Sequence, residues 1–267
     1  MPVAIVTDSS ARVPGVGAPT VRVVPITVAL AEIEGPDHEI DIDKVYEALR
    51  RDEPVKSRPP TALHYLAAIE DGDADGVLVL TPAEEFTPMV DAAKLAGSMS
   101  ARPTIVIDTR TAAAAQGLVA AAAAASADQG GDLDDVAAVA RAASRRAELI
   151  AALGSTSPMS SSGLLPPSRL VSRRRHSVQL FRLSDGRILS AGIVDAGEVV
   201  DSLLSAWRND GGEDAARSIV FHAGAETLAR NLRVATGSDE PAVPFSPAMT
   251  AHTGAGVVGV AWLRPLN

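Results

Sequence analysis

The sequence opens with Val3-Ala4-Ile5-Val6-Thr7-Asp8-Ser9-Ser10, and this stretch decides the fold. A run of apolar, mostly β-branched residues ends abruptly in small polar ones, which predicts a buried strand whose carboxyl end opens into a loop. In an open parallel sheet, ligands bind beyond the carboxyl ends of the strands. The Asp8 loop therefore offers a carboxylate and hydroxyl groups to a ligand. The same residues are also typical of a turn that only ends a strand.

Three more apolar segments of the first 150 residues predict strands, and helices are expected between and after them. The strands are expected at 21–30, 76–80 and 104–107, and the helices at 44–51, 62–70, 88–98, 112–127 and 132–153. Asp43, Thr61 and Thr87 are the predicted N-caps of the first three helices. Pro25 puts the 21–30 strand at a sheet edge, because proline cannot donate to a strand ladder. The alternation predicts a Rossmann-like parallel sheet with flanking helices over residues 1–153.

The composition changes at Gly154, where a segment rich in Ser, Pro and Gly begins and predicts a connection over 155–172. The charged run Arg173-Arg174-Arg175-His176 favours a solvated face over a phosphate site. A hairpin is expected around the Asp185-Gly186 turn, between strands at 178–183 and 188–191. Helical and strand patterns then alternate up to residue 262. Residues 154–267 therefore predict a second α/β domain with a mixed or antiparallel sheet.

The composition excludes several classes of protein. Of the 267 residues 46% are hydrophobic but only 3% aromatic, so the core must consist mainly of Ala, Val, Leu and Ile. The net charge of −9 argues against a nucleic-acid partner. The absence of cysteine excludes disulfides and thiol catalysis, and no histidine pair has metal-binding spacing. With no secretory signal and no integral membrane segment recognised, we expect a cytoplasmic protein without a metal site.

Near the carboxyl end, Ala251-His252-Thr253-Gly254-Ala255-Gly256 precedes the last predicted strand. Histidine is the side chain that can become a cation near neutral pH. Glycine lets backbone N–H groups approach a ligand closely. A buried histidine beside a tight turn explains the same residues equally well, so this motif alone leaves both interpretations open.

Taken together, four motifs resemble the DegV family, which consists of bacterial fatty-acid-binding proteins. They are Thr7-Asp8-Ser9-Ser10, a Ser-x-Pro loop at Ser57, a threonine loop after the strand at 76–80, and His252-Thr253-Gly254-Ala255-Gly256. The resemblance covers nearly the whole chain and implies two α/β domains with a ligand cleft between them. It implies a long-chain fatty acid as ligand, no other cofactor and no catalysis. Some members present the acyl group to a fatty acid kinase, which makes acyl phosphate.

The resemblance also implies that the hydroxyl loops and the histidine hold the fatty-acid carboxylate. The predicted ligand-binding residues are Ser57, Arg58, Thr61, Thr81, Thr87, His252 and Thr253, with Asp8 and Ser9 as a supporting loop. Helix N-termini favour anions, and a protonated histidine adds a charge-assisted hydrogen bond. Glu84 and Glu85 would repel a carboxylate unless they turn to solvent.

The chain departs from the family pattern and is identified as a divergent member. Lys56-Ser57-Arg58-Pro59-Pro60 stands in place of Thr-Ser-Gln-Pro-Ser, and Glu85-Phe86-Thr87 in place of Ser-Gly-Thr. Ser162-Gly163-Leu164-Leu165 replaces Gly-Gly-Arg-Ile and removes an arginine, and from its charge alone we expect Arg58 to compensate for it. The alternative function is a small α/β hydrolase or transferase that uses Asp8, Ser9 and His252. No Gly-x-Ser-x-Gly elbow or phosphate-binding glycine loop supports that alternative.

Overall fold

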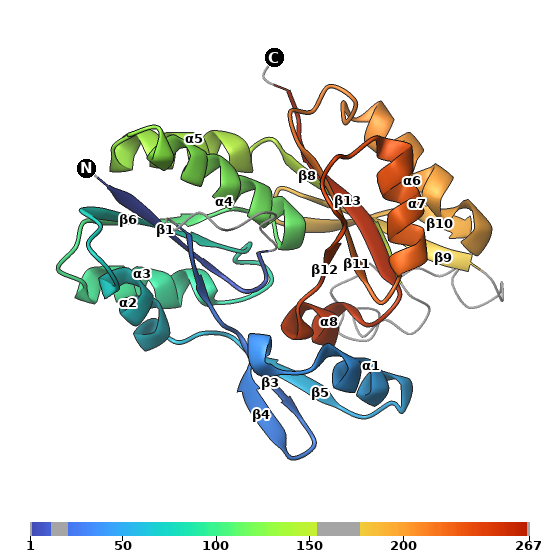
Figure 1. Ribbon diagram of the computed structural model, residues 1–267, viewed down its shortest axis with the longest axis horizontal. Coiled ribbons are helices and arrows are strands. Elements are labelled where there is room, and N and C mark those ends of the chain that lie inside the picture. Colours follow the sequence, from blue (N-terminus) through green and yellow to red (C-terminus); the bar gives the residue numbers. More distant parts are fainter. Residues whose placement is uncertain (1, 12–20, 154–176, 266–267) are drawn as a thin grey trace.

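The computed structural model describes residues 2–11, 21–153 and 177–265, which fold into three β-sheets with helices packed on and between them (Figure 1). The four-stranded sheet has the order β2-β1-β6-β7, the six-stranded sheet β10-β9-β8-β13-β11-β12, and the small sheet β4-β3-β5. The predicted α/β class, with a parallel first sheet and a mixed second sheet, is therefore confirmed.

The four-stranded sheet is entirely parallel and buried on both faces. It consists of β1 (Val3–Asp8), β2 (Val21–Val24), β6 (Gly76–Thr81) and β7 (Thr104–Asp108). On one face lie α2 (Ala62–Glu70) and α3 (Met89–Met99), and on the other α4 (Ala113–Asp128) and α5 (Leu133–Ser144). This two-sided burial explains why β1 is continuously apolar in sequence.

The Ala-rich helix α4 lies between the two larger sheets (Figure 1). It packs on β1 and β6 from one side and on β8, β11 and β13 from the other. A helix that is apolar all round is a buried helix, and alanine is its best former. Small alanine side chains let both sheets approach the same helix, so α4 joins the two halves of the core.

The six-stranded sheet separates two different cores. Its strands are β8 (Ala147–Ala152), β9 (Ser177–Ser184), β10 (Arg187–Asp195), β11 (Ser218–Ala223), β12 (Val243–Pro244) and β13 (Val257–Leu263). Phe181 and Phe221 point toward the α4 side. The opposite face carries Trp262 and is covered by α6 (Val199–Asn209), with Trp207, and by α7 (Glu226–Thr236). A short 3-10 turn, η3 (Ala196–Glu198), precedes α6.

The small antiparallel sheet forms a lobe at the lower edge of Figure 1, together with α1. It consists of β3 (Thr27–Leu30), β4 (Ile33–Pro36) and β5 (Val55–Arg58), with η1 (Asp37–Glu39) and α1 (Ile42–Arg50) in the same region. Helix α8 (Pro247–Thr253) comes from the other end of the chain and packs on β5, β3 and α1. This contact brings the Ser57 strand beside the His252 helix.

Two predicted elements differ from the structure. The segment 21–30 forms two strands in different sheets, β2 and β3, because Pro25 interrupts the ladder; β2 does lie at a sheet edge. The helix expected over 132–153 ends at Ser144, and residues 147–152 form β8. β8 pairs with β9 and β13 on its two sides, and this tertiary pairing overrides the helix propensity of its alanines. A domain division at residue 153 remains a prediction.

The predicted helix caps are confirmed in one of three cases. Thr61 caps α2 in a capping box with His64, as expected. In α1 the cap is Asp41, whose side chain accepts a hydrogen bond from the Asp43 backbone N–H. Pro88 rather than Thr87 occupies the N-cap position of α3, which has no side-chain cap. Thr87 is therefore not tied up in helix capping.

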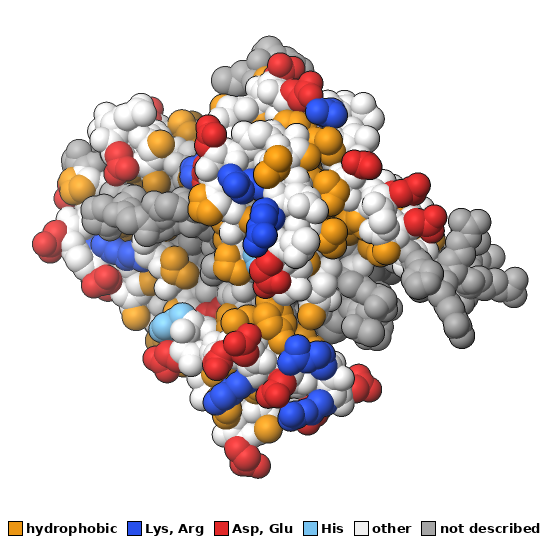
Figure 2. All heavy atoms as spheres, turned by 45° about the vertical axis from the view of Figure 1, so that its right-hand side comes forward, with side chains coloured by type: hydrophobic (Ala, Val, Ile, Leu, Met, Phe, Trp, Pro, Cys, Tyr) orange, Lys and Arg blue, Asp and Glu red, His pale blue; other side chains and the backbone are white. Residues whose placement is uncertain are grey.

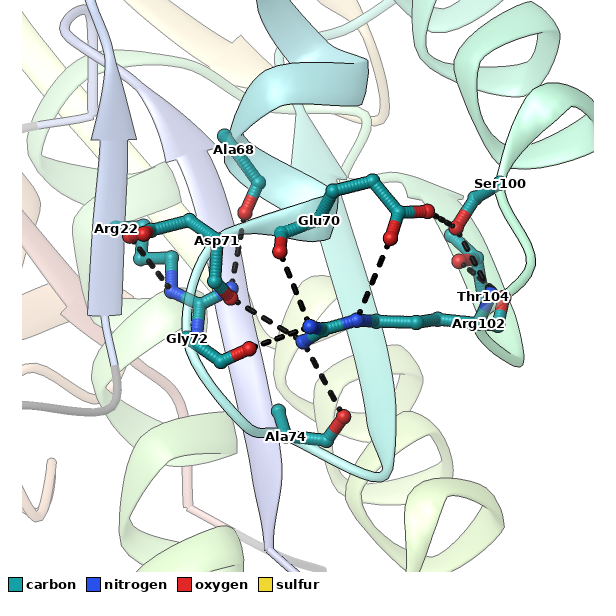
Figure 3. A network of polar contacts seen from close by, with 9 residues as sticks. All are labelled: Arg22, Ala68, Glu70, Asp71, Gly72, Ala74, Ser100, Arg102 and Thr104. Atoms are coloured by element: carbon teal, nitrogen blue, oxygen red, sulfur yellow. Dashed lines mark hydrogen bonds and ion pairs between the residues drawn. The ribbon is translucent and has the colours of Figure 1, made fainter.

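Arg102 fixes the loop that leads from α2 to β6 (Figure 3). Its guanidinium donates hydrogen bonds to the carbonyl oxygens of Glu70, Asp71, Gly72 and Ala74. It also pairs with the Glu70 carboxylate at 3.6 Å, while Arg22 donates to the Ala68 carbonyl at 2.9 Å. The carbonyls at the end of a helix lack intrahelical partners, and these two arginines supply them.

The predicted connection at 155–172, the Ser162–Leu165 segment and the run Arg173-Arg174-Arg175-His176 lie outside the described residues. Within the described part of the chain, no helix is both long and apolar enough to span a bilayer. Figure 2 shows acidic and basic side chains interspersed over the face in view, without one continuous basic surface.

Candidate functional site

A cavity of about 290 Å³ lies where the three sheets meet. Fifteen of its lining residues are apolar, and among the described residues none of the lining side chains is an Asp, Glu, Lys or Arg. All four phenylalanines of the chain line this one cavity. The lining residues are Ser10, Ile26, Ser57, Pro59, Pro82, Phe86, Thr87, Pro88, Met89, Ala112, Ala113, Leu149, Phe181, Leu183, Ile188, Phe221, Phe245, Met249, His252 and Thr253.

The structure joins two of the predicted site residues directly. Ser57 Oγ on β5 lies 2.7 Å from His252 Nε2 on α8, although 195 positions separate them in sequence. The His252 side chain is exposed, but desolvation by the protein atoms around it lowers its pKa below the ordinary histidine value. The imidazole is thus mainly neutral at pH 7 in the free protein, and the proton between the two atoms belongs to either partner depending on the tautomer.

Two further predicted residues, Thr87 and Thr253, line the same cavity. Thr87 is half-buried, and its hydroxyl has no hydrogen-bond partner among the residues that the structure describes. Thr253 is buried, and its Oγ1 donates to the Met249 carbonyl at 2.9 Å. The start of α3 at Met89 also faces the cavity, and the positive end of a helix favours an anion.

The Asp8 loop supports the site from beneath. The Asp8 carboxylate is fully buried and accepts hydrogen bonds from the Ser10 backbone N–H at 2.9 Å, from Ser10 Oγ, and from Gln116 Nε2 at 3.0 Å. Burial raises the pKa of Asp8 above its ordinary value, and the hydrogen bonds from Ser10 and Gln116 oppose that rise. Ser9 Oγ accepts from the Ile26 backbone N–H at 3.0 Å. Of the described residues in this loop, Ser10 alone lines the cavity, and the sequence did not predict it as a ligand-binding residue.

The structure places three predicted ligand-binding residues outside the cavity lining. The Arg58 guanidinium is exposed and pairs with the Glu34 carboxylate across the small sheet. Thr61 is occupied as the N-cap of α2. Thr81 is fully buried, and its Oγ1 faces the Ile107 carbonyl oxygen at 3.5 Å. Thr61 and Thr81 were predicted from their position at a helix start and a strand end, and in both residues that position reflects backbone capping or sheet packing. Arg58 was predicted from its charge, which the structure pairs with Glu34.

The sequence does not reveal the apolar wall of the cavity, because most of the residues in that wall look like ordinary core residues. The scarcity of aromatic residues is the signal that could have found it: with four phenylalanines in the chain, a shared location is informative. The alternative triad is not assembled either. Asp8 bonds Ser10 and Gln116, Ser9 bonds the Ile26 backbone, and in the described residues neither one forms a hydrogen bond with His252.

Comparisons of the sequence and of the structure with known proteins lead to the same family. The sequence model of the family described as "Uncharacterised protein, DegV family" matches residues 2–265. The fold is similar to a DegV lipid-binding protein from Thermotoga maritima (TM-score 0.85, 21% identity, 98% of each chain covered). It is equally similar to a DegV family protein from Thermus thermophilus that is reported to bind a fatty acid (TM-score 0.85, 22% identity, 99% of this chain and 100% of that one covered).

A third similar structure is a DegV family protein from Eubacterium eligens loaded with heptadecanoic acid. Its TM-score is 0.85 at 15% identity, over 98% of this chain and 100% of that one. No curated protein matches the sequence. Across residues 2–11, 21–153 and 177–265, no group of three or more His, Cys, Asp or Glu side chains is arranged to hold a metal ion.

Proposed function

Because the chain belongs to the DegV family, we propose that it binds a long-chain fatty acid in the cavity between its sheets. The observation that carries the proposal is the lining itself: fifteen apolar residues with a hydrogen-bonded Ser57–His252 pair in the wall. The fatty acids named in the structures of similar proteins support the same ligand class.

The tail and the carboxylate make different demands on the site. Each buried methylene contributes about 0.8 kcal/mol, so the apolar wall supplies most of the affinity. The carboxylate must find donors, because an unpaired buried charge is costly. We propose Ser57, Thr87 and His252, which line the cavity, as these donors. A bound carboxylate would then raise the pKa of His252 again, so that binding takes up a proton.

We further propose that the acyl carboxylate is presented to a separate fatty acid kinase for acyl-phosphate formation in the cytoplasm. The exposed side chain of His252 supports this part, because the end of the cavity proposed to bind the carboxylate is then open to the surface. The division near residue 153 belongs to the same proposal, with the cleft between the two units. In this proposal the protein binds its ligand without catalysing a reaction on it.

Lipid extraction and mass spectrometry of the purified protein test the ligand class, and a fluorescent fatty-acid titration tests the site. The variant Ser57→Ala/His252→Ala should keep its fold and bind about 100- to 10,000-fold more weakly, because it loses two hydrogen bonds to a charged group and each contributes about 1.5–3 kcal/mol. A matched control is Ser98→Ala/His38→Ala, which removes the same two side-chain types at exposed positions outside the cavity. Equal affinity of the two double variants would place the carboxylate elsewhere.

The hydrolase alternative now rests on the Ser57–His252 pair, whose spacing suits a nucleophile and its base. A base of this kind is oriented by a third group, and among the described residues none bonds the other ring nitrogen of His252. We therefore expect no turnover of a p-nitrophenyl acyl ester. Turnover that is lost in Ser57→Ala would replace the binding proposal with acyl transfer.

A further inference from the structure

Three segments that carry cavity residues meet at one arginine, Arg110. The first is the loop after β6, which contributes Phe86 and Thr87 to the lining. The second is the loop after β7, which contains Arg110 itself and leads into Ala112. The third is the β9–β10 hairpin, whose cross-strand pair Leu183 and Ile188 lines the opposite wall.

Arg110 bonds the other two segments simultaneously. Its Nε donates to Asp185 Oδ1 at 2.6 Å, and its Nη2 donates to Glu85 Oε1 at 3.0 Å and to the Asp185 carbonyl at 2.9 Å. The backbone N–H of Gly186 returns a hydrogen bond to the Arg110 carbonyl at 2.7 Å. Glu85 packs so closely on the hairpin turn that a Cβ on Gly186 would lie 2.5 Å from Glu85 Oε2.

The backbone of Arg110 is fixed by residues of its own loop, the one that follows β7. Its φ of 52° lies in the left-handed region, which a residue other than glycine adopts only when the surroundings fix it. The Asp108 carboxylate accepts from the Arg110 N–H at 2.7 Å and from the Glu84 N–H at 3.3 Å, and so bridges the two loops. The arginine therefore reaches the hairpin from a rigid base.

We propose that Arg110 is a positioning residue that holds the hairpin against the two loops around a bound acyl chain and thereby sets the rate of ligand release. This inference rests on the proposed function of the cavity. Moving the β9–β10 hairpin away from the loops after β6 and β7 breaks every contact that Arg110 makes to Asp185 and Gly186. The arrangement also explains Glu85, which pairs with Arg110 and is not among the residues that line the cavity.

The contact is suited to repeated opening because it is exposed to solvent. The side chains of Arg110, Glu85 and Asp185 are 40%, 36% and 79% exposed. Ion pairs of this kind are weak and are screened by salt. Release from the wild-type protein should therefore accelerate as the salt concentration rises. Packing contacts of the apolar wall do not weaken in this way, so salt dependence separates positioning by charge from a general structural role.

The test is stopped-flow release of a fluorescent fatty acid into excess unlabelled fatty acid, at low and high salt. Arg110→Gln should release the probe about three- to tenfold faster at low salt and should lose most of the salt dependence. Asp185→Asn and Glu85→Gln should each show part of that effect. Arg51→Gln is the matched control, because it breaks an exposed ion pair with Glu47 on α1, away from the cavity.

Hydrogen exchange of the ligand-free proteins supplies a readout that does not depend on binding. Arg110→Gln should speed exchange of the Gly186 amide and of the 83–88 loop, while α5 stays unchanged. Release and exchange that both match the wild type would overturn the role of Arg110. Failure of the wild-type protein to bind any acyl probe would instead count against the proposed function, and the exchange data would still decide whether Arg110 holds the walls together.

Discussion

Two polar networks of this molecule differ in how many of their hydrogen-bond donors are already used within the protein. At Arg102, the guanidinium donates to four backbone carbonyls and pairs with Glu70, and the cluster contributes nothing to the cavity lining (Figure 3). At Ser57 and His252, one hydrogen bond joins the pair, and the neighbouring Thr87 hydroxyl has no partner among the described residues. The first network has almost no unused donor, whereas the second keeps donors for a ligand.

The difference shows how binding groups can be distinguished from structural ones in this fold. A partly buried polar group that is fully bonded, such as the Arg102 guanidinium, stabilises the chain, and removing it leaves its partners without a protein donor. A polar group with an unused donor beside an apolar cavity stabilises little until a ligand supplies the acceptor. Changes in the Arg102 network should therefore alter stability, and changes at the Ser57 site should alter affinity.

The largest effect is expected from Arg102→Ala. The substitution leaves the carbonyls of the α2–β6 loop without donors and removes the ion pair with Glu70, so the free energy of unfolding should fall by about 2–4 kcal/mol. Urea denaturation measures this loss. The affinity for a fatty-acid probe, measured where the variant is fully folded, should stay within twofold of the wild type. A large loss of affinity in folded protein would contradict the separation of the two networks.

Thr87→Val should show the reverse pattern. The side chains have nearly the same shape, and the substitution removes a hydroxyl whose only expected partner is the ligand. Affinity for the probe should fall about tenfold, as for one lost hydrogen bond to a charged group, while the midpoint of urea unfolding stays unchanged or rises. Thr236→Val is the control, because that hydroxyl bonds the Leu232 carbonyl at the end of α7. If Thr87→Val lowers stability instead, Thr87 is a structural residue.

The pH should act on the two properties in opposite directions. The pKa of His252 is lowered in the free fold, so the unfolded chain binds protons more tightly, and acidification through pH ~6.5 should reduce stability. His222 contributes with the same sign, because burial lowers its pKa too. A bound carboxylate favours protonated His252, so affinity should rise about three- to tenfold from pH 8 to pH 6. Titrations of His252→Ala across this range should show little of that rise.

The smallest effect is expected from Arg58→Ala. The sequence predicts this arginine at the ligand carboxylate, but in the structure its side chain is exposed and pairs with Glu34. Exposed ion pairs contribute about 0.2–1 kcal/mol at most. Probe affinity should remain within twofold of the wild type, and Glu34→Gln should behave in the same way. A tenfold loss of affinity would show that Arg58 leaves Glu34 when the ligand binds.

The parallel sheet was predictable because its strands are short apolar runs that end in polar loops, and this pattern is local. β8 was not predictable in the same way. Its residues Ala147 to Ala152 favour a helix by propensity, and they form a strand because β9 and β13 arrive from distant parts of the chain. The small sheet around β3 was missed for a related reason, since Pro25 only indicates where one strand ends.

The candidate site followed a similar division. Ser57, Thr87, His252 and Thr253, which motifs in a fixed order predict for one site, do line one cavity, and their role in ligand binding stays a prediction. Thr61 and Thr81 share the same local signals, yet the structure uses their side chains for a helix cap and within the sheet. A single sequence does not distinguish a hydroxyl that has no partner within the protein from one that forms a hydrogen bond with the protein backbone.

The tryptophans and the cavity-lining phenylalanines lie on opposite faces of the six-stranded sheet, and this affects what tryptophan fluorescence can report. Both tryptophans, Trp207 and Trp262, are buried on the face covered by α6 and α7, whereas Phe181 and Phe221 belong to the cavity side. Trp207 Nε1 bonds Ser218 Oγ, and Trp262 Nε1 bonds the Asp210 carbonyl. Their emission should shift when the chain unfolds and stay nearly constant when the cavity fills. Tryptophan fluorescence should therefore report on the folding of this chain and respond little to ligand binding.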